Sequence, residues 1–141
     1  MHVTVTFDKK LPLVGVNENG QETLFDASLD FSGPARHASP MDVVLEALAA
    51  CSLMDILTIL KKQKKDPVRI DVELTAERAA EPPRVFTSIG ILYRLHGDGS
   101  SLDSFRKAIA LSIDKYCSVA AMLKAGGVEI TWEAELQAGA S

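Results

Sequence analysis

The sequence predicts an α+β domain in which an antiparallel sheet packs on one long, buried central helix. Residues 43–60 are apolar on every side, which is typical of a helix at the centre of a core. Segments before and after it alternate apolar and polar residues, the period of a half-buried strand. Strands and helices that are not in strict alternation indicate α+β rather than α/β architecture.

The first part of the chain predicts a hairpin. Val3, Val5 and Phe7 alternate with threonines, and Asn19-Gly20 is a strong turn signal because both residues tolerate a positive φ. An irregular loop over residues 26–39 follows. The predicted strands cover residues 3–7, 13–16 and 23–25.

The central helix has clear start and stop signals. We expect Ser39 to be its N-cap, Pro40 its first residue and Asp42 part of its first turn. The lysines of residues 61–65 suit the negative end of the helix dipole, and Pro67 marks where the helix has stopped.

The remaining segments predict two strands, two helices and a last strand. Ser100 and Asp103 match a helix start signal, and residues 102–116 carry apolar side chains at steps of three and four. Cys117-Ser118 lies at a break before a shorter helix. The predicted strands here are residues 68–77, 85–95 and 128–136, and the short helix is residues 119–124.

Length and composition limit the possible functions. A chain of 141 residues predicts a single domain, 1–141, and a net charge of −4 argues against nucleic acid as a partner. The amino terminus lacks the layout of a signal peptide, so we expect a cytoplasmic protein. No pair among its two Cys and three His has the short spacing of a zinc site, so neither a metal nor a cofactor is expected.

The all-round apolar helix predicts a homodimer. A membrane span is disfavoured because Asp55 near its middle would be costly. One sheet covers only one side of a helix, so the other side needs a second layer. Two central helices between two sheets would meet this need.

Two cysteine contexts point to a family. Residues 39–45 precede Ala49-Ala50-Cys51, and the second cysteine lies in Tyr116-Cys117-Ser118-Val119. Together with residues 74–78 and 82–87, they resemble the OsmC/Ohr family over nearly the whole chain. The resemblance implies an intertwined homodimer with active sites at the interface. It also implies reduction of organic hydroperoxides by attack of Cys51 and resolution by Cys117, with a thiol or dithiol as reductant.

The sequence departs from the family's pattern at two places. The best-studied peroxidases of the family have a Glu directly after the helix-opening proline, where this chain has Met41. They also have an Arg in the first hairpin, and residues 13–25 contain none.

Three further residues are candidates for a supporting role. Arg36, on the loop before the helix, is the nearest cation that could stabilise a Cys51 thiolate. Asp55 shares a helix face with Cys51 and would raise its pKa. Glu46 is expected to pair with a basic group on another layer.

Physical chemistry alone leaves the roles of both cysteines open. Cys51 fits a redox thiol or a small buried apolar residue, because free cysteine is among the most buried residue types. Cys117 fits a core thiol or a reactive one, since a position just before a helix favours the thiolate. The alternative function is a non-catalytic protein that binds a small apolar ligand in the interface pocket.

Overall fold

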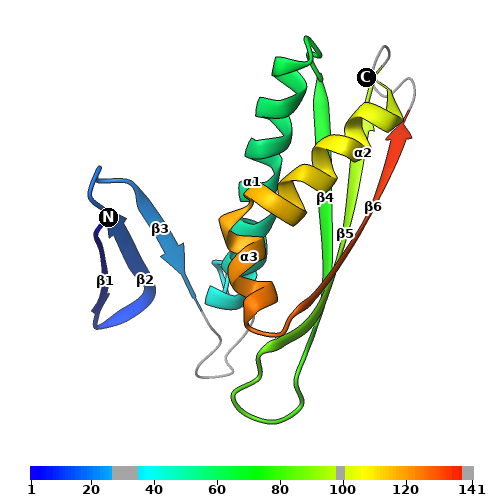
Figure 1. Cartoon of the computed structure of the whole chain (residues 1–141). Helices are drawn as coiled ribbons and strands as arrows, with labels where there is room; N and C mark the ends of the chain where they lie inside the picture. The colour runs from blue at the N-terminus through cyan, green and yellow to red at the C-terminus, as the bar shows by residue number, and fades with distance from the viewer. Residues whose placement is uncertain (27–34, 98–100, 138–141) are drawn as a thin grey trace. The chain divides into compact units, whose positions relative to one another are not determined.

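The computed structural model describes residues 1–26, 35–97 and 101–137 of the chain (Figure 1). The chain divides into two compact units, Met1–Glu46 and Ala47–Ser141, and each is described by itself. The elements in chain order are β1 (Val3–Asp8), β2 (Lys10–Asn17), β3 (Glu22–Phe25), α1 (Pro40–Lys62), β4 (Arg69–Arg78), β5 (Phe86–His96), α2 (Leu102–Leu111), the π-helical turn η1 (Ser112–Tyr116), α3 (Ser118–Ala125) and β6 (Glu129–Gln137).

The first unit contains the three predicted strands, which form an antiparallel sheet in the order β1-β2-β3. The side chain of Asn17 closes the turn by accepting hydrogen bonds from the backbone N–H groups of Asn19 and Gln21, both at 3.0 Å. Gly20 adopts the positive φ, 79°, that the turn requires. The expected half-burial of the first strand is wrong for the chain by itself, because every residue of β1 is exposed.

The start of α1 confirms the predicted cap. The Ser39 hydroxyl accepts a hydrogen bond from the Asp42 N–H at 3.1 Å, and the Asp42 carboxylate accepts one from the Ser39 N–H at 3.2 Å. This reciprocal pair satisfies two backbone donors, as in a capping box. Pro40 is the first helical residue, where its missing N–H costs nothing.

The second unit contains the sheet β4-β5-β6, which is mixed. β4 pairs with β5 antiparallel, with Val72 opposite Tyr93, whereas β6 pairs with β5 parallel, with Ala134 opposite Tyr93. The prediction of an antiparallel sheet is therefore wrong for β6. The reason is that α2, η1 and α3 connect β5 to β6, and such a crossover returns the chain in the same direction.

The core of this unit lies on the inner face of the sheet. Alternate residues of β5 are buried against the helices, and Tyr93 meets Phe105 of α2 edge-on at 6.4 Å between ring centroids. The largest fully buried side chains are Leu48, Ser52, Ile56, Leu60, Ile89, Tyr93, Leu95, Phe105, Ile109, Ser112 and Cys117.

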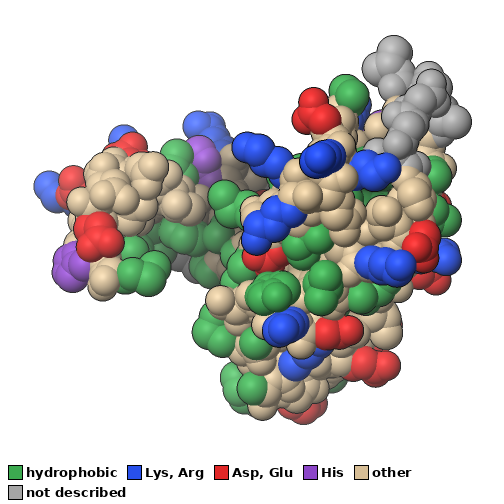
Figure 2. Space-filling model, turned by 45° about the horizontal axis from the view of Figure 1, so that its top comes forward, with side chains coloured by type: hydrophobic (Ala, Val, Ile, Leu, Met, Phe, Trp, Pro, Cys, Tyr) green, Lys and Arg blue, Asp and Glu red, His purple; other side chains and the backbone are tan. Residues whose placement is uncertain are grey.

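Helix α1 is buried along one row only. The buried residues recur every fourth position, at Leu48, Ser52, Ile56 and Leu60. On the opposite side of the helix, Met54 is 71% exposed and Leu57 is 42% exposed. The expected burial on all sides is therefore absent in the single chain. Apolar side chains are exposed among lysines and arginines on the face of the molecule that Figure 2 shows.

By length and composition, α1 is the one helix in the described ranges that could span a membrane, with a mean hydropathy of 2.1. The core helix of a soluble protein meets the same criterion.

The predicted second helix is interrupted. α2 ends at Leu111, and residues Ser112–Tyr116 form a π-helical turn. The cap of α2 is Ser101, whose hydroxyl accepts a hydrogen bond from the Ser104 N–H at 3.3 Å. The Ser100 start signal lies outside the described residues.

Candidate functional site

The two cysteines belong to different elements of the second unit. Cys51 lies in the middle of α1 and is partly exposed, whereas Cys117 lies between η1 and α3 and is 2% exposed. Both are free thiols.

Three hydrogen bonds fix the backbone around Cys117. Its N–H donates to the carbonyl of Ser112 at 2.7 Å and closes the π-helical turn. Its Sγ accepts a hydrogen bond from the Ala120 N–H at 3.4 Å and so acts as the N-cap of α3. The Lys124 ammonium donates to the carbonyl of Ile113 at 2.9 Å and ties α3 back to the turn. π-Helical turns of this kind occur frequently at functional sites.

The pKa of the Cys117 thiol is raised to about 11, mainly because burial disfavours the charged form. The Ala120 N–H lowers the pKa, and the Cys51 side chain raises it. The helix position was predicted to favour the thiolate; the cap is present, but burial outweighs it. Cys117 is therefore a neutral thiol near pH 7.

Ser52, the residue after Cys51, connects α1 to the sheet. Its Oγ donates its hydrogen to the carbonyl of Ala49 at 3.0 Å, and it lies 2.8 Å from the hydroxyl of Tyr93. Either hydroxyl can be the donor in this second contact. Burial raises the pKa of Tyr93 to about 12. A hydrogen bond from Ser52 to the ionised phenol opposes this rise, and the negative charge that Cys117 carries in alkali adds to it.

Ser112 connects η1 to α1. Its Oγ lies 3.2 Å from the carbonyl of Ser52 and 3.0 Å from the carboxylate of Asp55, and these two acceptors share its single hydrogen. Within the described residues, the carboxylate of Asp55 forms no ion pair, and its hydrogen-bond partner is the Ser112 hydroxyl. The structure thus brings Cys51, Cys117 and Asp55 into one unit.

Arg36 and Glu46, the two other predicted supporting residues, lie in the first unit. The Arg36 side chain is exposed, and its backbone N–H donates to the carboxylate of Asp26 at 3.1 Å. Glu46 is exposed on α1. Their action on Cys51 stays a prediction.

A groove of about 520 Å³ begins one turn after Cys51 along α1 and ends at the residue before Cys117. It combines apolar walls with a carboxylate and an ammonium, which suits a small amphipathic molecule. Its lining is Asp55, Thr58, Ile59, Lys62, Gln63, Leu111 and Tyr116.

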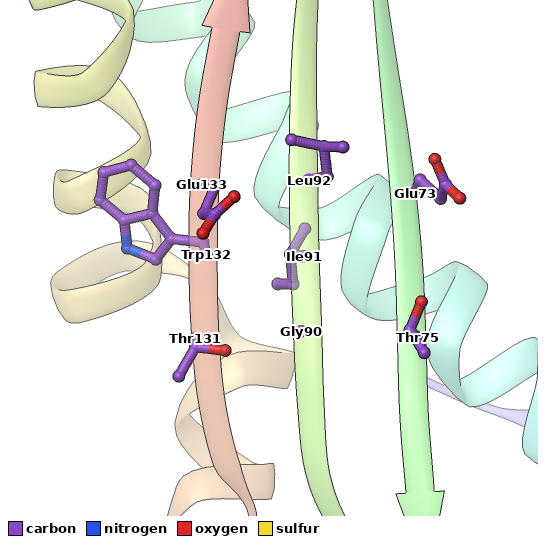
Figure 3. Close-up of a pocket in the computed structure, with 8 residues that line it drawn as sticks. All are labelled: Glu73, Thr75, Gly90, Ile91, Leu92, Thr131, Trp132 and Glu133. Carbon is purple, nitrogen blue, oxygen red and sulfur yellow. The ribbon is translucent and has the colours of Figure 1, made fainter.

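A second hollow, of about 320 Å³, lies on the sheet around Gly90 (Figure 3). Side chains from all three strands border it, among them Glu73, Thr75 and Glu133. Neither cysteine lines it, so we do not assign the thiol chemistry to this face. Within the ranges described, no group of three or more His, Cys, Asp or Glu could hold a metal ion.

Comparison with known proteins identifies the family. The model of the OsmC-like protein family matches residues 33–133, and the chain belongs to this family. It is 36% identical over 138 residues to protein YhfA of Escherichia coli K12, covering 98% of this chain and 99% of YhfA.

Two solved structures have the same fold. A hypothetical protein from Aquifex aeolicus is 26% identical, with a TM-score of 0.77 and 96% of each chain covered. An organic hydroperoxide resistance protein from Elizabethkingia anophelis is 13% identical, with a TM-score of 0.71, covering 96% of this chain and 94% of that one. At this identity, the second likeness shows the fold alone.

Sequence reasoning missed three residues of the site: Ser52, Tyr93 and Ser112. Each lies on the apolar face of its element. Ser52 and Ser112 interrupt the apolar patterns of their helices, and Tyr93 is one of the buried residues of its strand. A buried polar group needs a partner, which is the signal that could have identified the two serines. Which partners they find depends on packing.

The raised pKa of Cys117 predicts a loss of stability in alkali. The folded state binds this proton more tightly than the unfolded state, so the contribution is complete below pH 9.0 and is lost as the pH rises through about 11. Under reducing conditions, the urea midpoint of the wild type should fall between pH 9 and about pH 10. In Cys117→Ala this fall of the urea midpoint should be smaller. The raised pKa of Tyr93 also destabilises the fold in alkali, but at a higher pH than Cys117 does. Equal falls in the two proteins would contradict the assignment.

Proposed function

We propose that this protein reduces organic hydroperoxides through its two cysteines, with Cys51 as the attacking thiol and Cys117 as the resolving thiol. The observation that carries the proposal is the pair of free thiols in one unit, one partly exposed and one buried, with the Cys51 side chain affecting the pKa of Cys117. The shared fold with an organic hydroperoxide resistance protein supports it.

The proposed reaction has three balanced steps. The Cys51 thiolate attacks the peroxide oxygen, the O–O bond breaks, and the alkoxide leaves as an alcohol after taking up a proton. The resulting sulfenic acid condenses with the Cys117 thiol, forming a disulfide and releasing water. A dithiol reductant then reduces the disulfide by exchange and becomes a disulfide itself.

The difference in exposure between the two cysteines supports Cys51 as the attacking thiol and Cys117 as the resolving thiol. The nucleophile must be the thiolate and must meet the peroxide, and Cys117 is a buried, neutral thiol near pH 7. Cys51 is the more exposed of the two. Arg36 and Glu46 are proposed to support Cys51, and a charged guanidinium would be the group that stabilises its thiolate.

The active form is proposed to be an intertwined homodimer in the cytoplasm. The exposed apolar row of α1, with Met54 and Leu57, and the exposed apolar residues of β1 are surfaces that a second copy would bury. A reducing compartment would supply thiols to regenerate the pair.

A second candidate function is non-catalytic binding of a small apolar ligand, with structural cysteines. The groove beside Leu111 and Tyr116 is the observation that favours it.

Treatment with hydroperoxide separates the two candidates. Substoichiometric cumene hydroperoxide should convert both thiols to an intramolecular disulfide, seen by mass spectrometry as the loss of two hydrogens and a peptide linking Cys51 to Cys117. If both thiols survive excess cumene hydroperoxide unmodified, the peroxidase proposal fails and ligand binding is the remaining candidate.

A further inference from the structure

Two hydrogen bonds made by Ser112 connect the backbone segments that carry Cys51 and Cys117. The carbonyl of Ser52, one residue after Cys51, accepts a hydrogen bond from the Ser112 Oγ at 3.2 Å. The carbonyl of Ser112 accepts a hydrogen bond from the Cys117 N–H at 2.7 Å. One residue thus holds α1 by its side chain and Cys117 by its backbone.

The surroundings of Ser112 make this connection rigid. Ser112 has no exposed surface, so its hydroxyl cannot exchange these partners for water. The carboxylate of Asp55 is a second acceptor for the same hydrogen, at 3.0 Å, and Asp55 is also on α1. Both acceptors therefore hold the π-helical turn against the same helix.

Tyr93 supports the arrangement from the other side of Ser52. Its hydroxyl is buried, is hydrogen-bonded to the Ser52 Oγ at 2.8 Å, and fixes this turn of α1 against the centre of the sheet. The segment that carries Cys51 is thus bonded on one side to β5 and on the other to the turn that precedes Cys117.

We infer that Ser112 is a positioning residue that sets the distance and orientation of Cys117 relative to Cys51 and so favours closure of the disulfide between them. This inference rests on the proposed function. Disulfide geometry is specific, because bridged Cα atoms lie within roughly 7 Å and the bond is strained outside a narrow range of dihedral angles. A hydroxyl that restricts the relative movement of the two segments raises the effective concentration of one thiol at the other.

The test measures the disulfide equilibrium in glutathione buffers, in which the dithiol protein and oxidised glutathione give the disulfide protein and two reduced glutathiones. Ser112→Ala should lower the equilibrium constant about tenfold or more relative to the wild type. The alkylation rate of Cys51 in the reduced protein should change less than about twofold, because Ser112 acts on the pairing and not on access to Cys51. Ser118→Ala is the matched control, an exposed serine beside Cys117 that makes none of these bonds.

The isosteric pair Ser112→Thr and Ser112→Val separates the hydroxyl from the shape of the side chain. Threonine should keep an equilibrium constant near that of the wild type, and valine should lower it as alanine does, with thermal unfolding of the reduced forms measured in parallel. If Ser112→Ala or Ser112→Val folds and keeps the wild-type constant, the inference is wrong and the proposed function stands. If the wild type forms no Cys51–Cys117 disulfide in any glutathione buffer, the proposed function fails and the inference fails with it.

Discussion

Replacing Cys51 with serine is expected to abolish hydroperoxide consumption. In the proposed reaction, Cys51 supplies the thiolate that attacks the peroxide, and a serine hydroxyl is not ionised at neutral pH. With cumene hydroperoxide as substrate and dithiothreitol as the dithiol, the rate should fall at least about a hundredfold, to that of the uncatalysed reaction. Peroxide consumption followed over time is the measurement.

Cys117→Ser is the matched control, because it changes the same atom at the other cysteine. In the absence of dithiothreitol, it should consume about one equivalent of peroxide rapidly and leave Cys51 as a sulfenic acid that dimedone traps. Burst consumption by Cys51→Ser together with none by Cys117→Ser would reverse the two roles. Undiminished steady-state consumption by Cys51→Ser would remove Cys51 from the mechanism.

The second large effect concerns the exposed apolar row of α1. The double variant Met54→Glu and Leu57→Glu should be monomeric at protein concentrations near 10 μM, at which the wild type should be dimeric. A fully buried Met or Leu side chain contributes about 1.5–3 kcal/mol, so losing two of them in each protomer should raise the dimer Kd by more than about a hundredfold. Glutamate is a good helix former, so α1 should persist. Sedimentation velocity gives the mass.

Val68→Glu is the control for this experiment. Val68 is 90% exposed and lies outside α1, so the same change from an apolar to an acidic side chain should leave the dimer intact. A wild type that sediments as a monomer at this concentration, or a double variant that stays dimeric, would refute the interface on this row.

Short sequence patterns were sufficient to predict the helices, strands and turns of this protein. The Ser39–Asp42 cap, the Asn19-Gly20 turn and the alternation along β5 act over a few residues, and each appears in the structure where the sequence predicts it. The two cysteine contexts were equally local, and the match of the family model over residues 33–133 confirms the family they indicate.

Only the tertiary structure decided how the strands pair, how deeply Cys117 is buried and which buried groups form hydrogen bonds with one another. The parallel pairing of β6 depends on the route of the crossover, which alternation along a single strand does not encode. The raised pKa of Cys117 depends on how deeply its segment is buried, and this outweighs the helix position visible in the sequence. The bonds from Ser112 to Ser52 and from Tyr93 to Ser52 join residues 60 and 41 positions apart. Such partners are chosen by packing, because a buried hydroxyl must bond to whichever group the fold places beside it.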